Sequence, residues 1–169
     1  HTSGDTVYVN LYTTNEMRQS LAAGEVSLSV KTDYPWDGTV RLTVNTAPGD
    51  MVLALHLPGW CRSFTVAVNG APAEYKQQDG YLYLARDWSV GDSVVLTLDM
   101  PVMTVRANPR VSEDIGKVAI QRGPVVYCLE EPDNGRDLQR LYLSANTAFS
   151  RIYSFVTIST VPIHFSSFV

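Results

Sequence analysis

The run MPVMTVRANPRVSEDIGKVAIQRGPVVYCLE, residues 100–130, alternates short apolar segments with Asn-Pro, Gly and Gly-Pro breaks. Residues 102–106 and 117–121 have the alternation of strands, and residues 125–129 form a β-branched and aromatic run suited to a buried strand. Because proline lacks an N–H and fixes φ, we expect Pro109 and Pro124 at strand ends or edges. The stretch therefore predicts β-structure, and nothing in it is an evident catalytic device.

Three arginines, Arg106, Arg110 and Arg122, recur beside these breaks. Arginine at the rim of a sheet often lays its aliphatic stem along the sheet or pairs with a nearby acid, here Glu113, Asp114 or Glu130. Its planar fork of donors also suits an anionic group or the surface of a second domain. We therefore regard the three arginines as candidates for a domain contact, with the rim role as the plainer alternative.

The composition is that of an ordinary globular chain. Its 169 residues are 45% hydrophobic and 18% charged, and the formal net charge is -4. This length is enough to bury a core without metal or disulfide cross-links. Neither a net basic balance nor a basic run is present, so we expect no nucleic-acid partner. The sequence has no targeting signal and no apolar run near the roughly 18 residues of a transmembrane helix, so we expect no membrane partner.

Short alternating runs also occupy the chain before residue 100. Asn69-Gly70 is the strongest turn signal, and it predicts a hairpin from residues 64–68 to a strand near Ala73. Residues 15–23 are the only plausible helical turn, and residues 138–143 could form one further strand. Many short strands with almost no helix predict an all-β, antiparallel sandwich or barrel. The expected strands are residues 6–13, 25–31, 39–46, 51–57, 64–68, 80–85 and 93–99.

The C-terminal segment differs from the rest. Residues 150–169 are rich in aromatic, Ser and β-branched residues and carry one charge among them. The run could be a strand, although an exposed strand of this kind would be prone to aggregation. We therefore predict a β-sandwich domain over residues 1–149 and, over residues 150–169, a divergent tail or the start of a truncated second domain.

Aromatic residues beside turn signals are the candidates for sugar contact. The segment DYPWDG, residues 33–38, surrounds Tyr34 and Trp36 with two aspartates, a mixture that can stack on a sugar ring and bind its hydroxyls. We expect the plainer interpretation to hold, namely a tight turn in which Trp36 is largely buried and covers one end of the core. Trp60 and Trp88 have the same two interpretations, and only exposure in one plane would favour sugar binding.

No motif for catalysis or metal binding stands out. The cysteines, Cys61 and Cys128, are too few for a disulfide framework and lack Cys-x-x-Cys or Cys-His spacing. We expect free, buried thiols, with a mutual disulfide as the alternative. The three histidines are scattered, and no pair of carboxylates is evidently placed across a cleft, as a glycosidase needs. We expect no catalytic residue, no metal and no cofactor in this chain.

Five blocks in order resemble the region after the catalytic domain in glycoside hydrolase family 127, the β-L-arabinofuranosidase-like proteins. The match covers roughly residues 7–143 and fades after residue 149. The blocks are TDYPWDG (32–38), LPGWC (57–61), VNG (68–70), GYLYLARDWSVGD (80–92), and MPVMTVRANPRV with GKVAIQRGPVVYCLE (100–111 and 116–130).

The resemblance implies a jelly-roll-like β-sandwich that follows an (α/α)6-barrel catalytic domain. It further implies that catalysis, by a zinc-bound cysteine with neighbouring cysteines and a glutamate, takes place in that barrel, whose motifs are not in this sequence. We expect an accessory domain of a secreted or periplasmic bacterial glycoside hydrolase acting on arabinose-containing glycans, with the catalytic domain of the same parent chain as partner. The alternatives are a carbohydrate-binding module that uses the four aromatic candidates, and a structural or interaction sandwich without sugar affinity.

Overall fold

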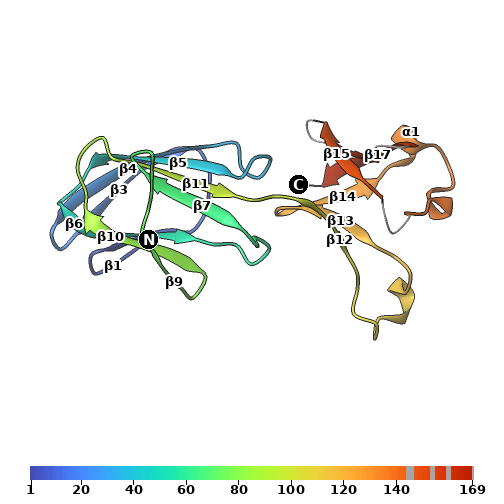
Figure 1. Ribbon diagram of the computed structural model, residues 1–169, viewed down its shortest axis with the longest axis horizontal. Coiled ribbons are helices and arrows are strands. Elements are labelled where there is room, and N and C mark those ends of the chain that lie inside the picture. Colours follow the sequence, from blue (N-terminus) through green and yellow to red (C-terminus); the bar gives the residue numbers. More distant parts are fainter. Residues whose placement is uncertain (144–146, 153–154, 159–160, 169) are drawn as a thin grey trace. The chain divides into compact units, whose positions relative to one another are not determined.

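The computed structural model describes residues 1–143, 147–152, 155–158 and 161–168, and the chain forms two compact units, residues 1–100 and 101–169. Both units consist mainly of strands (Figure 1). The sequence placed the boundary between residues 149 and 150, which falls inside the second unit. Alternation continues through residues 100–130, but Pro101 has no N–H with which to extend a ladder, and the second unit begins there.

The first unit is a sandwich of a five-stranded and a six-stranded sheet. Within residues 1–100 every strand pair is antiparallel except β2 with β6, which is parallel. The five-stranded sheet has the order β1 (Thr2–Ser3), β2 (Thr6–Val9), β6 (Asp50–His56), β10 (Tyr81–Asp87), β9 (Lys76–Gln78). The six-stranded sheet has the order β3 (Asn15–Leu21), β4 (Gly24–Thr32), β5 (Thr39–Thr46), β11 (Ser93–Leu98), β7 (Phe64–Val68), β8 (Ala71–Pro72).

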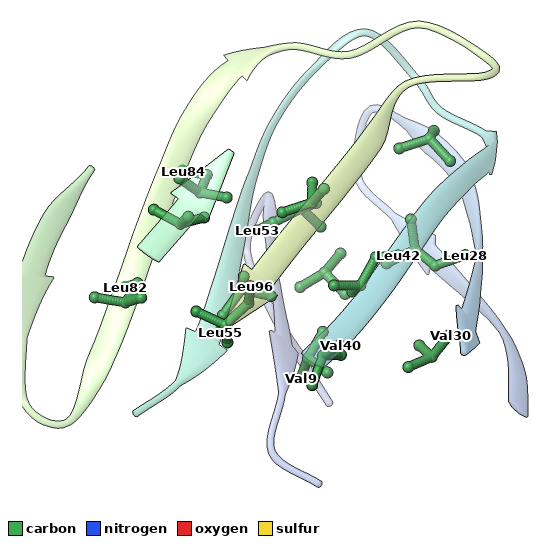
Figure 2. Close-up of a cluster of buried hydrophobic side chains, with 14 of the residues drawn as sticks. Val9, Leu28, Val30, Val40, Leu42, Leu53, Leu55, Leu82, Leu84 and Leu96 are labelled. Atoms are coloured by element: carbon green, nitrogen blue, oxygen red, sulfur yellow. The ribbon is translucent and has the colours of Figure 1, made fainter. Parts of the chain in front are cut away.

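Alternate residues of both sheets fill the space between them. Leu53 and Leu82 from one sheet and Leu42 and Leu96 from the other are at most 1% exposed. Figure 2 shows the leucines and valines of these strands gathered in one cluster. Period-two alternation with one buried face is what a sandwich requires. The predicted all-β, antiparallel sandwich is therefore confirmed, while its jelly-roll character stays a prediction.

The hairpin turn predicted at Asn69-Gly70 is confirmed. Asn69 has φ 52° and Gly70 has φ 81°, and they join β7 to β8, which begins at Ala71. Positive φ at both central residues suits the two-residue hairpin turn, whose twist matches that of the two strands. The Asn69 side chain also accepts a hydrogen bond from Ser93 N at 2.9 Å, which ties the turn to β11.

Two local expectations in the first unit are wrong. Residues 15–21 form β3 rather than a helical turn, because they pair along their whole length with β4, and pairing of this kind overrides local helix propensity. The alternation expected through residues 6–13 also stops early, since β2 ends at Val9. Leu11 is consequently 79% exposed and Tyr12 only 6% exposed, the reverse of the predicted faces.

The second unit contains one six-stranded sheet. Its order is β12 (Val102–Val105), β13 (Ala119–Arg122), β14 (Val125–Leu129), β17 (Val161–Phe168), β16 (Phe155–Ile158), β15 (Phe149–Ile152). The C-terminal segment thus supplies strands to the sheet, while residues 153–154, 159–160 and 169 lie outside the described part of the chain.

The helices of the second unit are short, and one of them corrects an expectation. They are α1 (Glu131–Asn134) and the 3-10 turns η1 (Ser112–Asp114) and η2 (Leu138–Arg140). A further strand was expected over residues 138–143, but η2 occupies its first half, where Asp137 with φ 68° redirects the backbone. Among the described residues, no helix is both long enough and apolar enough to cross a membrane.

Candidate functional site

The turn between β4 and β5 holds two of the predicted sugar-contact residues, Tyr34 and Trp36. Asp33 O accepts hydrogen bonds from the backbone N–H groups of Trp36 at 2.9 Å and Asp37 at 3.1 Å. The Asp37 carboxylate accepts one from Thr39 N at 2.8 Å, and the Tyr34-Pro35 peptide bond is cis. Aspartates at turn ends fix the backbone through such bonds. The segment is therefore a well-defined turn, as its residues predicted.

A polar groove of about 470 Å³ lies beside this turn. It combines carboxylates, cationic groups and hydroxyls, which are the partners that sugar hydroxyls take. Its lining residues are Thr14, Lys31, Thr32, Asp33, Asp37, Thr39 and Arg41. Trp36, between the two lining aspartates in sequence, is half-buried and is not part of the core cluster, so the core role expected for it is not confirmed. The turn can thus offer one tryptophan with hydrogen-bonding groups nearby.

Tyr34 and Trp60 are brought together at the edge of the core. Both are half-buried and pack against the core cluster. The Tyr34 ring meets that of Tyr12 edge-on, with centroids 5.9 Å apart. Burial raises the pKa of Tyr34, and the hydrogen bond with the Trp60 side chain offsets part of that rise. Much of each ring is therefore occupied by protein contacts rather than aligned for a ligand.

Trp88 fills the core instead of lining a site. It is 2% exposed, and its indole N–H donates to Met51 O at 3.1 Å. The Arg86 guanidinium carbon lies 5.2 Å from the Trp88 ring centroid, within the range of a cation–π contact. Trp88 therefore has no free ring face to offer a sugar, in agreement with the plainer interpretation of this residue.

The three candidate arginines lie in the second unit. Arg106 follows β12 and is exposed, as is Arg110, whose backbone N–H donates to the Asn108 side chain at 3.0 Å. Arg122 is the last residue of β13, half-buried, and opposite Val102 and Val125 in register. Arg106 and Arg110 thus lie in the first part of the connection from β12 to β13, and their role in a domain contact stays a prediction.

The cysteines do not fit a zinc site. Cys61 lies in the first unit and Cys128 in the second, and both are free and half-buried. Burial is the largest influence on the Cys61 thiol and raises its pKa, although hydrogen bonds with the backbone of Asp99 and Ser63 oppose the rise. A nucleophilic or metal-binding cysteine needs the opposite shift. In the described part of the chain no three His, Cys, Asp or Glu side chains gather to hold a metal ion.

Sequence reasoning missed a group of aromatic side chains on the outer surface of the five-stranded sheet. Tyr8, Tyr81 and Tyr83 are half-buried and lie on the opposite side from the core leucines of the same strands. The signal was available in the alternation of TVYV and YLYLAR, where the tyrosines stand at the positions between the valines or leucines of the core. Recognising it required the order β2-β6-β10, which brings these strands together.

Two family models match the chain. Residues 6–100 match the model described as beta-L-arabinofuranosidase, GH127 middle domain, and residues 102–166 match the glycoside hydrolase family 127 C-terminal domain. A curated relative, the non-reducing end beta-L-arabinofuranosidase of Bifidobacterium longum subsp. longum, is 41% identical over 121 residues. That match covers 69% of this chain and 18% of the relative.

Solved structures show the same similarity. A GH127 beta-L-arabinofuranosidase from Geobacillus stearothermophilus T6 is 42% identical with a TM-score of 0.84, over 89% of this chain and 24% of that one. A further GH127 beta-arabinofuranosidase is 36% identical with a TM-score of 0.83, over 87% of this chain and 26% of that one. The chain therefore spans about a fifth to a quarter of the length of these relatives.

Proposed function

The chain belongs to glycoside hydrolase family 127, and from this membership we propose that it is a non-catalytic accessory part of a bacterial glycoside hydrolase acting on arabinose-containing glycans. Its partner is the (α/α)6-barrel catalytic domain of the same parent chain, which it packs against and supports. The parent is secreted or periplasmic, where such glycans are met.

One observation carries this proposal. The two compact units, residues 1–100 and 101–169, coincide with the matches to the family's middle and C-terminal domain models. In the relatives, roughly three quarters or more of the polypeptide lies outside the matched region. The family resemblance attributes the zinc-bound cysteine nucleophile to a barrel that lies in that other part. A sandwich whose interior is filled with apolar side chains is suited to supporting that barrel.

The chemistry of the chain itself supports the same conclusion. Glycoside hydrolysis needs two carboxyl groups placed across the scissile bond, or an activated nucleophile in their stead. Asp33 and Asp37 line one groove, but the Asp37 carboxylate already accepts a hydrogen bond from Thr39 N within the turn. The Cys61 thiol has a raised pKa, which keeps it protonated at neutral pH.

A carbohydrate-binding module is the second candidate. The observation that favours it is the polar groove beside the turn at Trp36. A half-buried tryptophan and a hydrogen-bonding rim can hold one sugar residue. Against it, Trp88 is buried and Tyr34 and Trp60 pack against the core, so the four aromatic candidates do not form one exposed row.

An activity and metal assay tests the proposal. The purified 169-residue chain is incubated with an aryl β-L-arabinofuranoside, zinc and a reductant, and its metal content is measured. We expect no turnover and no retained zinc. Turnover that disappears in Cys61→Ser or Cys128→Ser, or one zinc ion retained per chain, would show that the assignment as a non-catalytic accessory part is wrong. Retention on arabinan that is lost in Trp36→Ala would favour the binding-module alternative.

A further inference from the structure

The outer surface of the five-stranded sheet has an aromatic face, composed of Tyr8, His56, Tyr81 and Tyr83, which we call the tyrosine face. In register, Ala54 of β6 lies between Tyr8 of β2 and Tyr83 of β10, and Tyr81 lies opposite His56. Ala54 is fully buried although it points away from the core side of the sheet. The neighbouring rings therefore cover it, and the face is a packed layer rather than a set of free side chains.

The rings of this face stand against one another instead of lying flat. Tyr8 meets Tyr81 with centroids 5.3 Å apart and planes at 89°, and it meets Tyr83 at 6.3 Å and 88°. The Tyr81 hydroxyl donates to the Asn10 side chain at 3.0 Å, and a hydrogen bond with Tyr8 raises the pKa of Tyr83. A platform on which several sugar residues stack would have its rings open and in one plane. Edge-to-face rings with partnered hydroxyls form instead a rigid, partly apolar surface suited to another protein surface.

The outer surface of the six-stranded sheet is different. Arg41 and Thr43 of β5 are exposed there, and Asn45 donates to Ser29 at 2.6 Å, which in turn contacts Glu16. Charged and hydroxyl groups of this kind are stable in water and need no cover. The two outer surfaces of one sandwich therefore differ in chemistry, and aromatic side chains of the kind enriched at the centre of interfaces are concentrated on only one.

The polypeptide enters the first unit beside the tyrosine face. Tyr8 N donates to His1 O at 2.8 Å, and the His1 ring lies 5.4 Å from that of Tyr8. The matching family model is that of a middle domain, so in proteins of the family another domain precedes this one. Leu11 is 79% exposed and follows Asn10, whose side chain accepts the hydrogen bond from Tyr81.

From these observations we propose that the tyrosine face, with Leu11, is the surface on which the domain preceding the middle domain docks. This inference rests on the proposed accessory function and gives it a location. A domain connected at His1 needs no long linker to reach Tyr8, and its docking would cover the tyrosine rings and the exposed Leu11 together.

Hydroxyl-radical footprinting tests the inference. The 169-residue chain is compared with a longer protein in which it replaces the matching region of the Geobacillus relative, whose arabinofuranosidase activity reports folding. We expect the oxidation rates of Tyr81, Tyr83 and Leu11 to fall about fivefold or more in the longer protein. Tyr75, which is 47% exposed and outside this face, is the internal control, and its oxidation rate should be the same in both proteins. If the longer protein is inactive, the same rates are read with the preceding portion of the relative added in trans.

The outcomes separate the two proposals. Protection around Arg41 and Thr43 with none at the tyrosine face would overturn the docking surface and leave the accessory function standing. No protection anywhere on the chain would overturn both. Protection of Tyr81 in the isolated chain by an arabinan oligosaccharide would show that the face binds glycan.

As a second measurement, Leu11→Asp should lower the melting temperature of the longer protein but not that of the 169-residue chain, whereas Arg41→Ser should lower neither. An unchanged melting temperature of the longer protein would contradict the inference.

Discussion

Trp88, which follows β10, and Met51 of the neighbouring strand β6 are joined by a hydrogen bond of 3.1 Å from the indole N–H to the main-chain carbonyl oxygen. Both residues are buried, at 2% and 3% exposure. The bond gives the polar atom of the largest aromatic side chain a partner within the core, which a buried indole needs. Trp88 therefore combines packing with hydrogen bonding, and its replacement tests how the sandwich is stabilised.

The first prediction concerns the two tryptophans with contrasting burial. Trp88→Ala should lower the free energy of unfolding by about 3 to 5 kcal/mol, because it empties a buried site. Trp36→Ala should cost clearly less, since Trp36 is half-buried and outside the core cluster. Urea unfolding followed by circular dichroism measures both. Equal losses for the two variants would contradict the assignment of Trp88 as the core residue.

A second prediction compares two glycines. A Cβ added at Gly38 would lie 2.0 Å from Leu98 O, whereas one added at Gly59 would have no atom within 4 Å. Gly38 also accepts the hydrogen bond of Leu98 N at 2.9 Å, so the two backbones cannot separate without losing it. Gly38→Ala should destabilise the chain by about 1 to 3 kcal/mol or more, as overpacking does. Gly59→Ala is the matched control, and a similar melting-temperature loss in both variants would count against this close approach.

The third prediction is that the contribution of Asp92 to the stability of the folded chain depends on pH. Its carboxylate accepts hydrogen bonds from Ser89 N at 2.9 Å and from Asn69 at 2.7 Å, and these lower its pKa below the ordinary value of 3.8. A carboxyl group whose pKa is lower in the folded chain than in the unfolded chain stabilises the fold at pH values above the unfolded-state pKa. This stabilisation is lost as the pH falls through the folded-state pKa.

Because Asp92 is only half-buried, solvent screening keeps this contribution small, below about 1 kcal/mol. Asp92→Asn should therefore be slightly less stable than the parent at pH 6, and the gap should close below pH 3.8. Denaturant midpoints across this range provide the measurement. A stability difference between the two proteins that grows as the pH falls would contradict this prediction.

The fourth prediction concerns thiol reactivity. Burial raises the pKa of Cys61, so at pH 8 its thiolate fraction should be smaller than that of an unburied cysteine. Alkylation by iodoacetamide, followed by mass spectrometry of the Cys128→Ser variant, should be slower than that of a free cysteine peptide. The urea-unfolded variant supplies the control for intrinsic reactivity. Faster labelling in the folded chain would indicate an activated thiolate and would oppose a non-catalytic role.

Much of the first unit could be predicted from the sequence, because period-two alternation and turn residues act locally. Asn69-Gly70 identified its hairpin since both positions favour positive φ. Residues 15–21 were misassigned because their strand character comes from pairing with β4, which a local pattern does not record. The tyrosine face was missed for a related reason: Tyr8 and Tyr83 become neighbours only through β6, whose pairing with β2 is parallel.

The candidate site was only partly predictable. The aspartates of the turn at residues 33–38 indicated its backbone hydrogen bonds, which depend on neighbours in sequence. Burial depends on distant strands, so the sequence could not separate the core residue Trp88 from the half-buried Trp36. The boundary at residues 100 and 101 was hidden because strand-like alternation continues on both sides of it.

The most direct test of the accessory function measures arabinofuranosidase activity that survives heating. The portion of the Geobacillus relative that precedes the region matched by this chain is produced alone and joined to this chain, and hydrolysis of an aryl β-L-arabinofuranoside is followed after incubation at rising temperatures. We predict that the joined protein retains activity at temperatures that inactivate the portion alone, while the 169-residue chain by itself gives none. Equal heat resistance with and without this chain, or turnover by the chain alone, would contradict the account.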